Sequence, residues 1–288
     1  MRLSSPSAAG KSLSQVPEIR PGQSIELLKD LHILTRDGKL NQDSRRKLKQ
    51  VYHLYQFIEP LLAEALAERP DIELVDHGAG KSYLGFILYD LFFKAHAPGG
   101  RIHGIETRDE LVTSSRRLAD KLGFSSGMRF QNLSVADSIT SDRLPGRIDV
   151  VTALHACNTA TDDAIRFALK KDARAIVLVP CCQAEVAAAL RRNKQQALRG
   201  PIAELWRHPI HTREFGSHVT NVLRCLQLEA HGYEVTVTEL VGWEHSMKNE
   251  LIIARRQPER PRRRAAERLA ALLGMLGLEE LSERFFTS

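Results

Sequence analysis

The sequence predicts an α/β fold, in which helices cover both faces of a seven-stranded, mostly parallel sheet. Five short, mostly apolar runs alternate with turns and helical patterns; they cover 72–75, 101–105, 128–133, 148–151 and 175–179. Strands that alternate with helices are typical of parallel sheets, because each crossover packs a helix against the sheet. Two later strand-like runs, 233–240 and 250–254, predict an antiparallel C-terminal hairpin.

Helices are predicted before the first strand. Residues 1–23 are rich in serine and form a predicted disordered leader. Residues 24–70 form a helical N-terminal extension, with a plausible N-cap at Asp43 and a kink or a join between two helices at Pro60. The basic stretch 44–50 is interpreted as a solvated helix start, with a substrate-facing patch as the alternative.

The first strand and the turn after it are the most informative part of the chain. The run 72–75 contains no helix breaker and ends at Asp76, which predicts a buried strand. Gly78 and Gly80 predict a tight turn, and a helix follows over 82–91. Such a turn lets the backbone approach a ligand and presents the first N–H groups of the helix to it, as in nucleotide-binding sheets.

The turn does not fit the common phosphate-binding motifs. Gly80-Lys81-Ser82 resembles the end of an ATPase phosphate loop, but that motif requires a glycine where the chain has Val75. Dinucleotide sites require a third glycine, which is absent. An acid that closes the strand before Gly-x-Gly resembles motif I of class I S-adenosylmethionine (SAM)-dependent methyltransferases, which have a Rossmann-like domain. The resemblance implies SAM as the cofactor, and a sulfonium without phosphates suits the acid Asp76.

The resemblance also implies a cofactor site. It places Glu106, which closes the second strand, at the ribose hydroxyls, although an acid that caps the helix from Asp109 is an alternative. It places Asp137, after the third strand, at the adenine ring, and the amides of 78–82 at the cofactor carboxylate. The implied cofactor-binding residues are Asp76, Gly78, Ala79, Gly80, Lys81, Glu106, Asp137 and Leu154.

Two further motifs follow the fourth and fifth strands. Residues 154–162 are Leu-His-Ala-Cys-Asn-Thr-Ala-Thr-Asp, and 180–182 are Pro-Cys-Cys. Both resemble the methyltransferase group that includes the glutathione-transferase-like C-terminal-domain protein and some tRNA methyltransferase relatives. The resemblance covers 72–185. The chain departs from the group at Asn158, where the group typically has glycine.

Methyl transfer from a sulfonium requires an aligned acceptor, exclusion of water and removal of a proton, but no metal or covalent intermediate. His155 is the predicted general base and Asn158 the residue that orients the acceptor. Alternatively, His155 hydrogen-bonds the loop backbone. The turn at 247–249 resembles a Pro-Lys-Asn step of the family, with Met in place of Pro. The predicted substrate-binding residues are Cys157, Cys181, Cys182, Lys248 and Asn249.

A zinc site is the alternative interpretation of the residues at the same strand ends. His155, Cys157, Cys181 and Cys182 form a legitimate His/Cys₃ set. Vicinal cysteines fit one metal poorly and Cys-x-x-Cys spacing is absent, so no metal is predicted. The four cysteines also lack the spacing of a disulfide framework, which predicts a reduced, cytoplasmic setting.

Composition indicates an ordinary globular protein, with 43% hydrophobic and 26% charged residues and no apolar stretch as long as a membrane span. The net charge of +6 permits an anionic partner such as RNA, or simply keeps the protein in solution. Residues 257–288 combine a basic linker with an amphipathic helix over 265–281. Such a tail suits nucleic-acid binding and helix docking equally well.

These features make 71–256 the predicted SAM-binding methyltransferase domain, between the N-terminal extension and the basic linker with its C-terminal helix. The predicted function is methyl transfer to RNA, with tRNA favoured through the resemblance. The alternatives are methyl transfer to a protein or a small molecule, and a non-catalytic methyltransferase-like protein that binds RNA or cofactor. The sequence leaves the methylated atom and the oligomeric state open.

Overall fold

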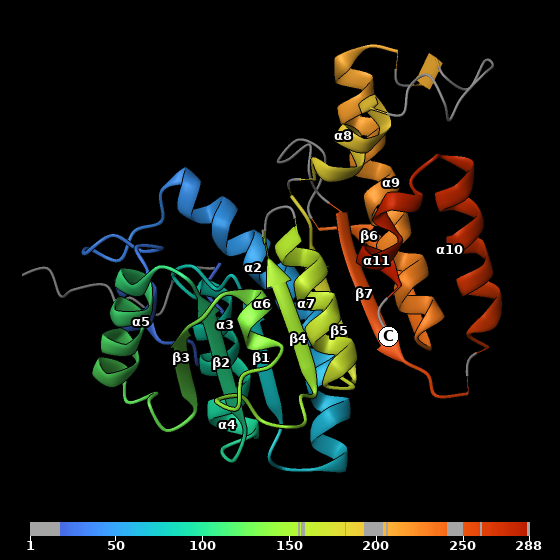
Figure 1. Cartoon of the computed structure of the whole chain (residues 1–288). Helices are drawn as coiled ribbons and strands as arrows, with labels where there is room; N and C mark the ends of the chain where they lie inside the picture. The colour runs from blue at the N-terminus through green and yellow to red at the C-terminus, as the bar shows by residue number, and fades with distance from the viewer. Residues whose placement is uncertain are drawn as a thin grey trace, which may run out of the picture.

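The structure is a computed structural model that describes residues 18–154, 156, 159–181, 183–192, 204–205, 207–240, 250–259 and 261–286. Within these ranges, seven strands form one sheet in the order β3-β2-β1-β4-β5-β7-β6 (Figure 1). The strands are β1 (Glu73–His77), β2 (Arg101–Glu106), β3 (Met128–Asn132), β4 (Val150–Leu154), β5 (Ala175–Val179), β6 (Tyr233–Glu239) and β7 (Glu250–Arg256).

The strand directions confirm the predicted fold class. Strands β1 to β5 are parallel to their neighbours among themselves, whereas β7 is antiparallel to both β5 and β6. From β1 the chain proceeds outward to β2 and β3, and then returns to the other side of β1 to form β4 and β5. This reversal places a crevice at the carboxyl ends of β1 and β4, where open α/β sheets bind ligands.

Helices cover both faces of the sheet. The α-helices are α1 (Ile25–Asp30), α2 (Gln42–Glu68), α3 (Tyr83–Leu88), α4 (Lys94–His96), α5 (Asp109–Leu122), α6 (Val135–Ser138), α7 (Thr159–Lys170), α8 (Glu185–Arg192), α9 (Pro209–Ala230), α10 (Arg263–Met275) and α11 (Ser282–Phe285). A π-helical turn, η2 (Tyr89–Phe93), joins α3 to α4, and a short 3₁₀ turn, η4 (Glu279–Leu281), precedes α11. In the described ranges, no helix is both long and apolar enough to cross a bilayer.

The core is divided by the sheet. One cluster packs α1, α2, α3 and α5 against one face, and a second packs α6, α7 and the end of α9 against the other. Alternate residues of β5 serve the two clusters, because Val177 packs in the first and Ile176 and Leu178 in the second. This division explains why β5 is apolar throughout. A third cluster joins α8, α9, α10 and α11, at the right of Figure 1.

The N-terminal extension is built on the long helix α2. A single helix passes through Pro60, which excludes the predicted join between two helices. Pro60 has no N–H to donate to the carbonyl oxygen of Gln56, four residues earlier in the helix. Both residues are exposed, so this carbonyl group lies on the solvent side of α2. The N-cap is Asn41 rather than Asp43. Residues 18–23 belong to the leader that the sequence predicts to be disordered, but in the structure they pack against α2. The buried side chain of Gln23 accepts a hydrogen bond from the hydroxyl of Tyr52 in α2.

The chain after residue 201 differs from the prediction. The stretch 201–219 shows no clean apolar period, which predicts an irregular substrate-binding insertion, but α9 begins at Pro209. Buried positions in its first half include Thr212 and Gly216, so the apolar periodicity of the sequence is weak although the helix is packed. A Cβ at Gly216 would lie 2.6 Å from the Cβ of Ala187, so glycine allows α8 and α9 to approach closely.

Candidate functional site

The glycine turn after β1 is fastened to the end of β2. Gly78 (φ +65°) and Gly80 (φ +59°) have left-handed conformations that residues with side chains disfavour. The amide of Ala79 donates to the carbonyl oxygen of Ile105 at 3.0 Å, and the amide of Gly80 donates to Oε2 of Glu106 at 2.9 Å. These bonds hold the turn at the carboxyl ends of both strands.

A cavity of about 360 Å³ opens beside this turn. Six of the eight residues predicted to bind the cofactor line it, namely Asp76, Gly78, Ala79, Gly80, Lys81 and Leu154. Its other walls are Ile33, Lys47, Gln50, Val51, Leu54, Tyr83, Leu84 and Arg108. The volume is typical of small-molecule and cofactor sites. The N-terminal extension therefore forms part of the same cavity as the strand ends.

Asp76 is the buried acid of this cavity, with 3% of its surface exposed. The hydroxyl of Thr152, on the neighbouring strand β4, donates to its Oδ1 at 2.7 Å. Burial raises the pKa of Asp76 to about 7, and the hydrogen bond from Thr152 only partly opposes this effect. Its charge therefore changes near neutral pH.

Glu106 has the opposite electrostatic environment. Its carboxylate accepts hydrogen bonds from the amides of Gly80, Thr107 and Arg108 and from the Arg108 guanidinium, whose Nε lies 3.0 Å from Oε1. Burial by itself would raise its pKa, but the hydrogen bonds from Arg108 and Gly80 outweigh burial and lower the pKa to about 2. Glu106 is therefore ionised at neutral pH and paired with Arg108.

Asp137 lies outside the cavity lining. It is exposed in the first turn of α6, where its amide donates to Oγ of Ser134 at 3.0 Å and its carboxylate accepts from that hydroxyl at 2.6 Å. Ser138 of the same helix lies 3.0 Å from Nε2 of the buried His77 in β1. Burial lowers the pKa of His77 to about 3, so this ring is neutral and holds α6 against the sheet. The contact of Asp137 with adenine stays a prediction.

A buried polar network supports the segment after β5. The guanidinium of Arg224 in α9 donates to both carboxylate oxygens of Asp162 in α7, at 2.6 and 2.9 Å. Beside it, Oδ1 of Asn221 accepts a hydrogen bond from the side-chain Nε2 of Gln183 at 2.8 Å. All four side chains are buried. Since Gln183 follows the Pro-Cys-Cys motif, the network holds the segment that carries Cys181.

Six residues of the predicted site lie outside the described residues, namely His155, Cys157, Asn158, Cys182, Lys248 and Asn249. Their neighbours are described. Leu154 lines the cavity at the end of β4, and Cys181 is half-buried two residues after the end of β5. Strands β4 and β5 are paired, so both motif segments leave the sheet at the edge that holds the cavity.

A family of methyltransferase domains matches residues 46–189, which is half of the chain. The chain belongs to this family. A relative from Bos taurus, Glutathione S-transferase C-terminal domain-containing protein, is 27% identical over 148 residues, which cover 51% of this chain and 20% of the relative. This methyltransferase chain thus spans about a fifth of the length of the curated relatives that it matches.

Two solved structures of methyltransferase fold are also similar. Aeropyrum pernix fibrillarin, with natively bound S-adenosyl-L-methionine, is 12% identical and has a TM-score of 0.40, over 64% of this chain and 67% of that chain. Precorrin-6y C5,15-methyltransferase from Geobacter metallireducens is 18% identical and also has a TM-score of 0.40, over 65% and 80% of the two chains.

The cofactor of this methyltransferase is SAM, and the cavity fits it. SAM combines a flat adenine and a sulfonium-bearing chain with an ammonium, a carboxylate and two ribose hydroxyls. The cavity combines aliphatic walls, such as Val51, Leu54 and Leu84, with one buried acid and with cations at Lys47 and Lys81. Its left-handed glycines leave room for a ligand against the backbone.

The contribution of α2 to this cavity was not predicted from the sequence, for which a substrate-facing patch over 44–50 was only the alternative interpretation. Within the basic stretch 44–50, Arg45 and Arg46 are exposed and form surface ion pairs, as the interpretation of a solvated face expects. Lys47 and Gln50 instead line the cavity. Residues three apart share a helix face, so the sequence could have grouped these two side chains but not the turn that they meet.

Proposed function

We propose that this methyltransferase transfers a methyl group from SAM to RNA, with tRNA as the favoured class. The observation that carries the proposal is the single cavity shared by Asp76, the glycine turn, Leu154 and α2. This cavity is large enough for the cofactor, and it reaches Leu154 at the end of β4, where the motif predicted to contact the acceptor begins. The net charge of +6 supports a polyanionic acceptor.

The cofactor would be held by groups of different charge. Asp76 would accept hydrogen bonds from the ammonium, and the amides of 78–82 together with Lys81 would hold the carboxylate. The carboxylate of Glu106 would accept hydrogen bonds from the ribose hydroxyls. These bonds would replace those that the Arg108 guanidinium donates to Glu106 in this structure. We retain Asp137 as the proposed adenine contact and Ala79 and Leu154 as walls.

The acceptor side consists of the motif segments after β4 and β5. When bound, SAM supplies an activated methyl group, and the chain must align the acceptor, exclude water and remove a proton. His155 directly follows the cavity-lining Leu154, so we assign it as the general base and Asn158 as the orienting group. The proposed substrate contacts are Cys157, Cys181, Cys182, Lys248 and Asn249.

The test is methyl incorporation from radiolabelled SAM into separated tRNA, other RNA, protein and small-molecule fractions of a cell extract. We expect label in the tRNA fraction, and a rate reduced by a factor of about 10² or more in His155→Ala, because a general base contributes on that order. His96→Ala, which alters an exposed histidine of α4 far from the motif in sequence, is the matched control and should retain the wild-type rate.

The distribution of label decides among the alternatives. Label in protein or small molecules, with none in RNA, would replace the RNA proposal by one of the other acceptors. Absence of label from every fraction, together with binding of S-adenosylhomocysteine in a calorimeter, would leave a cofactor-binding scaffold without turnover.

A further inference from the structure

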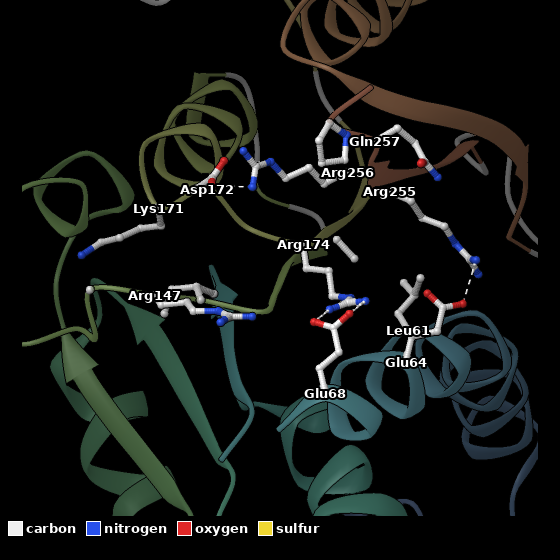
Figure 2. A pocket seen from close by; sticks show the side chains of 14 residues that line it. Leu61, Glu64, Glu68, Arg147, Lys171, Asp172, Arg174, Arg255, Arg256 and Gln257 are labelled. Atoms are coloured by element: carbon white, nitrogen blue, oxygen red, sulfur yellow. Dashed lines mark hydrogen bonds and ion pairs between the residues drawn. The ribbon is translucent and has the colours of Figure 1, made fainter. Parts of the chain in front are cut away.

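A larger cavity, of about 770 Å³, lies at the opposite edge of the sheet (Figure 2). Residues that precede β4 and β5, residues at the end of β7, and the C-terminal half of α2 surround it. The parallel strands begin at this edge and end at the edge that holds the SAM cavity. With a rise of about 3.3 Å per residue, strand β4 separates the two edges by about 16 Å.

The lining of this cavity has more positive than negative side chains. Five are cationic, namely Arg147, Lys171, Arg174, Arg255 and Arg256, and three are carboxylates. Each carboxylate pairs with one cation: Glu68 with Arg174, Glu64 with Arg255, and Asp172 with Arg256 (Figure 2). The lining carboxylates therefore leave Arg147 and Lys171 as surplus positive charge.

The surroundings only partly neutralise this surplus. Nη2 of Arg147 lies 3.4 Å from Oδ1 of the buried Asp149, whose Oδ2 lies 3.5 Å from Arg69, and Arg69 also pairs with Asp71 at 3.2 Å. In the part of the chain that the structure describes, Lys171 has no carboxylate partner, and its ammonium lies 5.9 Å from the centre of the Phe167 ring. Burial lowers the pKa of Lys171, so its charge is partly desolvated and would gain from an anion.

The basic linker extends the same edge. The amide of Gln257 donates to the carbonyl oxygen of Gly232 at 2.7 Å, which fastens the linker beside the start of β6. A Cβ at Gly232 would lie 2.9 Å from Nε of Arg262, so that side chain packs here too. Arg262 and Arg264 are exposed. Three segments that are distant in sequence thus bring positively charged side chains to one edge, and the excess of positive charge there favours the binding of an anion.

We propose that this edge is a binding site for phosphate groups, which the backbone of the RNA substrate would supply; the RNA source rests on the proposed function. The guanidinium group of arginine and the ammonium group of lysine commonly bind phosphate in proteins. A stacked strand advances about 3.4 Å per nucleotide, so an RNA that reaches both cavities spans about five nucleotides or more. A single nucleotide would be too short to occupy both sites.

The test measures binding of fluorescently labelled bulk tRNA by anisotropy across a salt series. We compare the double variant Arg147→Gln/Lys171→Gln with the matched double variant Arg143→Gln/Lys170→Gln. The control removes the same charge from exposed residues of the same two segments, and neither of its residues lines the cavity. We expect about tenfold weaker binding and a salt slope smaller by about two for the cavity variant only.

Equal affinity and slope for the two double variants would overturn the site while leaving an RNA substrate intact. Because Arg147 contacts Asp149, Lys171→Gln alone serves as a second variant, and thermal melting verifies that each variant is folded. If wild type binds no tRNA, the RNA substrate is wrong, and calorimetry with inorganic pyrophosphate decides the site. Pyrophosphate binding that is lost in the cavity variant supports a site for free phosphate, and equal or absent binding overturns the site.

Discussion

Two acids at neighbouring strand ends have opposite properties because their hydrogen-bond donors differ. Asp76 has one hydroxyl donor and is buried, so its pKa rises to about 7. Glu106 is surrounded by amide and guanidinium donors, and its pKa falls to about 2. The site therefore holds one carboxylate that stays charged and one whose charge depends on pH.

The raised pKa of Asp76 predicts a pH-dependent cost to stability in the cofactor-free protein. The folded-state pKa of about 7 exceeds the usual value of 3.8, so the folded chain binds the extra proton between these pH values. The stabilisation that this proton provides is fully present below pH 3.8. As the pH rises from 3.8 to 7, the free energy of unfolding falls by about 1.4 kcal/mol per pH unit. Asp76→Asn should remove this component, so that the variant gains stability relative to wild type as pH increases.

Thermal melts of wild type and Asp76→Asn from pH 5 to pH 8 measure this difference. Asp71→Asn, which alters an exposed acid just before β1, is the control and should follow the wild-type curve. The same Asp76 variant should bind S-adenosylhomocysteine more weakly. Melting temperatures of Asp76→Asn that run parallel to wild type across the range would contradict the raised pKa.

Among the elements, α8 and α9 depend on a close approach that a single methyl group would disturb. The Cβ introduced by Gly216→Ala would lie 2.6 Å from the Cβ of Ala187, so the two helices must move apart. We expect a loss of about 1–3 kcal/mol in the free energy of unfolding. In α10, a Cβ at Gly274 would have no neighbour closer than Glu279 at 3.8 Å. Gly274→Ala should therefore stabilise by about 0.5–1 kcal/mol.

Urea unfolding of the two glycine variants measures both effects, and their opposite signs distinguish packing from helix propensity. A stabilising Gly216→Ala would show that α8 and α9 can separate without cost.

The elements that were predictable from sequence are those whose pattern is local. The apolar run of β5 and the glycine turn after β1 required only the residues themselves. The burial of α9 was not predictable, because Thr212, Gly216 and Arg224 are buried through partners on other elements. The hydrogen bond from the Gly80 amide to Glu106 is also tertiary in origin, since the two residues lie 26 positions apart in the sequence.

At the scale of the whole molecule, α2 connects the two cavities. Its first half contributes Lys47, Gln50, Val51 and Leu54 to the SAM cavity, and its second half contributes Leu61, Glu64 and Glu68 to the phosphate-site cavity. A helix of 27 residues is about 40 Å long, which exceeds the length of the parallel strands. The N-terminal extension is therefore a structural part of both sites.

This arrangement predicts that cofactor binding protects one half of α2 more than the other. With saturating S-adenosylhomocysteine, amide hydrogen exchange should slow by about tenfold or more over 47–54, because a ligand packed against this turn opposes local opening. Exchange over 61–68 should change less, and exchange in α10, which lines neither cavity, should not change. Equal protection of all three segments would indicate global stabilisation, and unchanged exchange over 47–54 would remove α2 from the cofactor site.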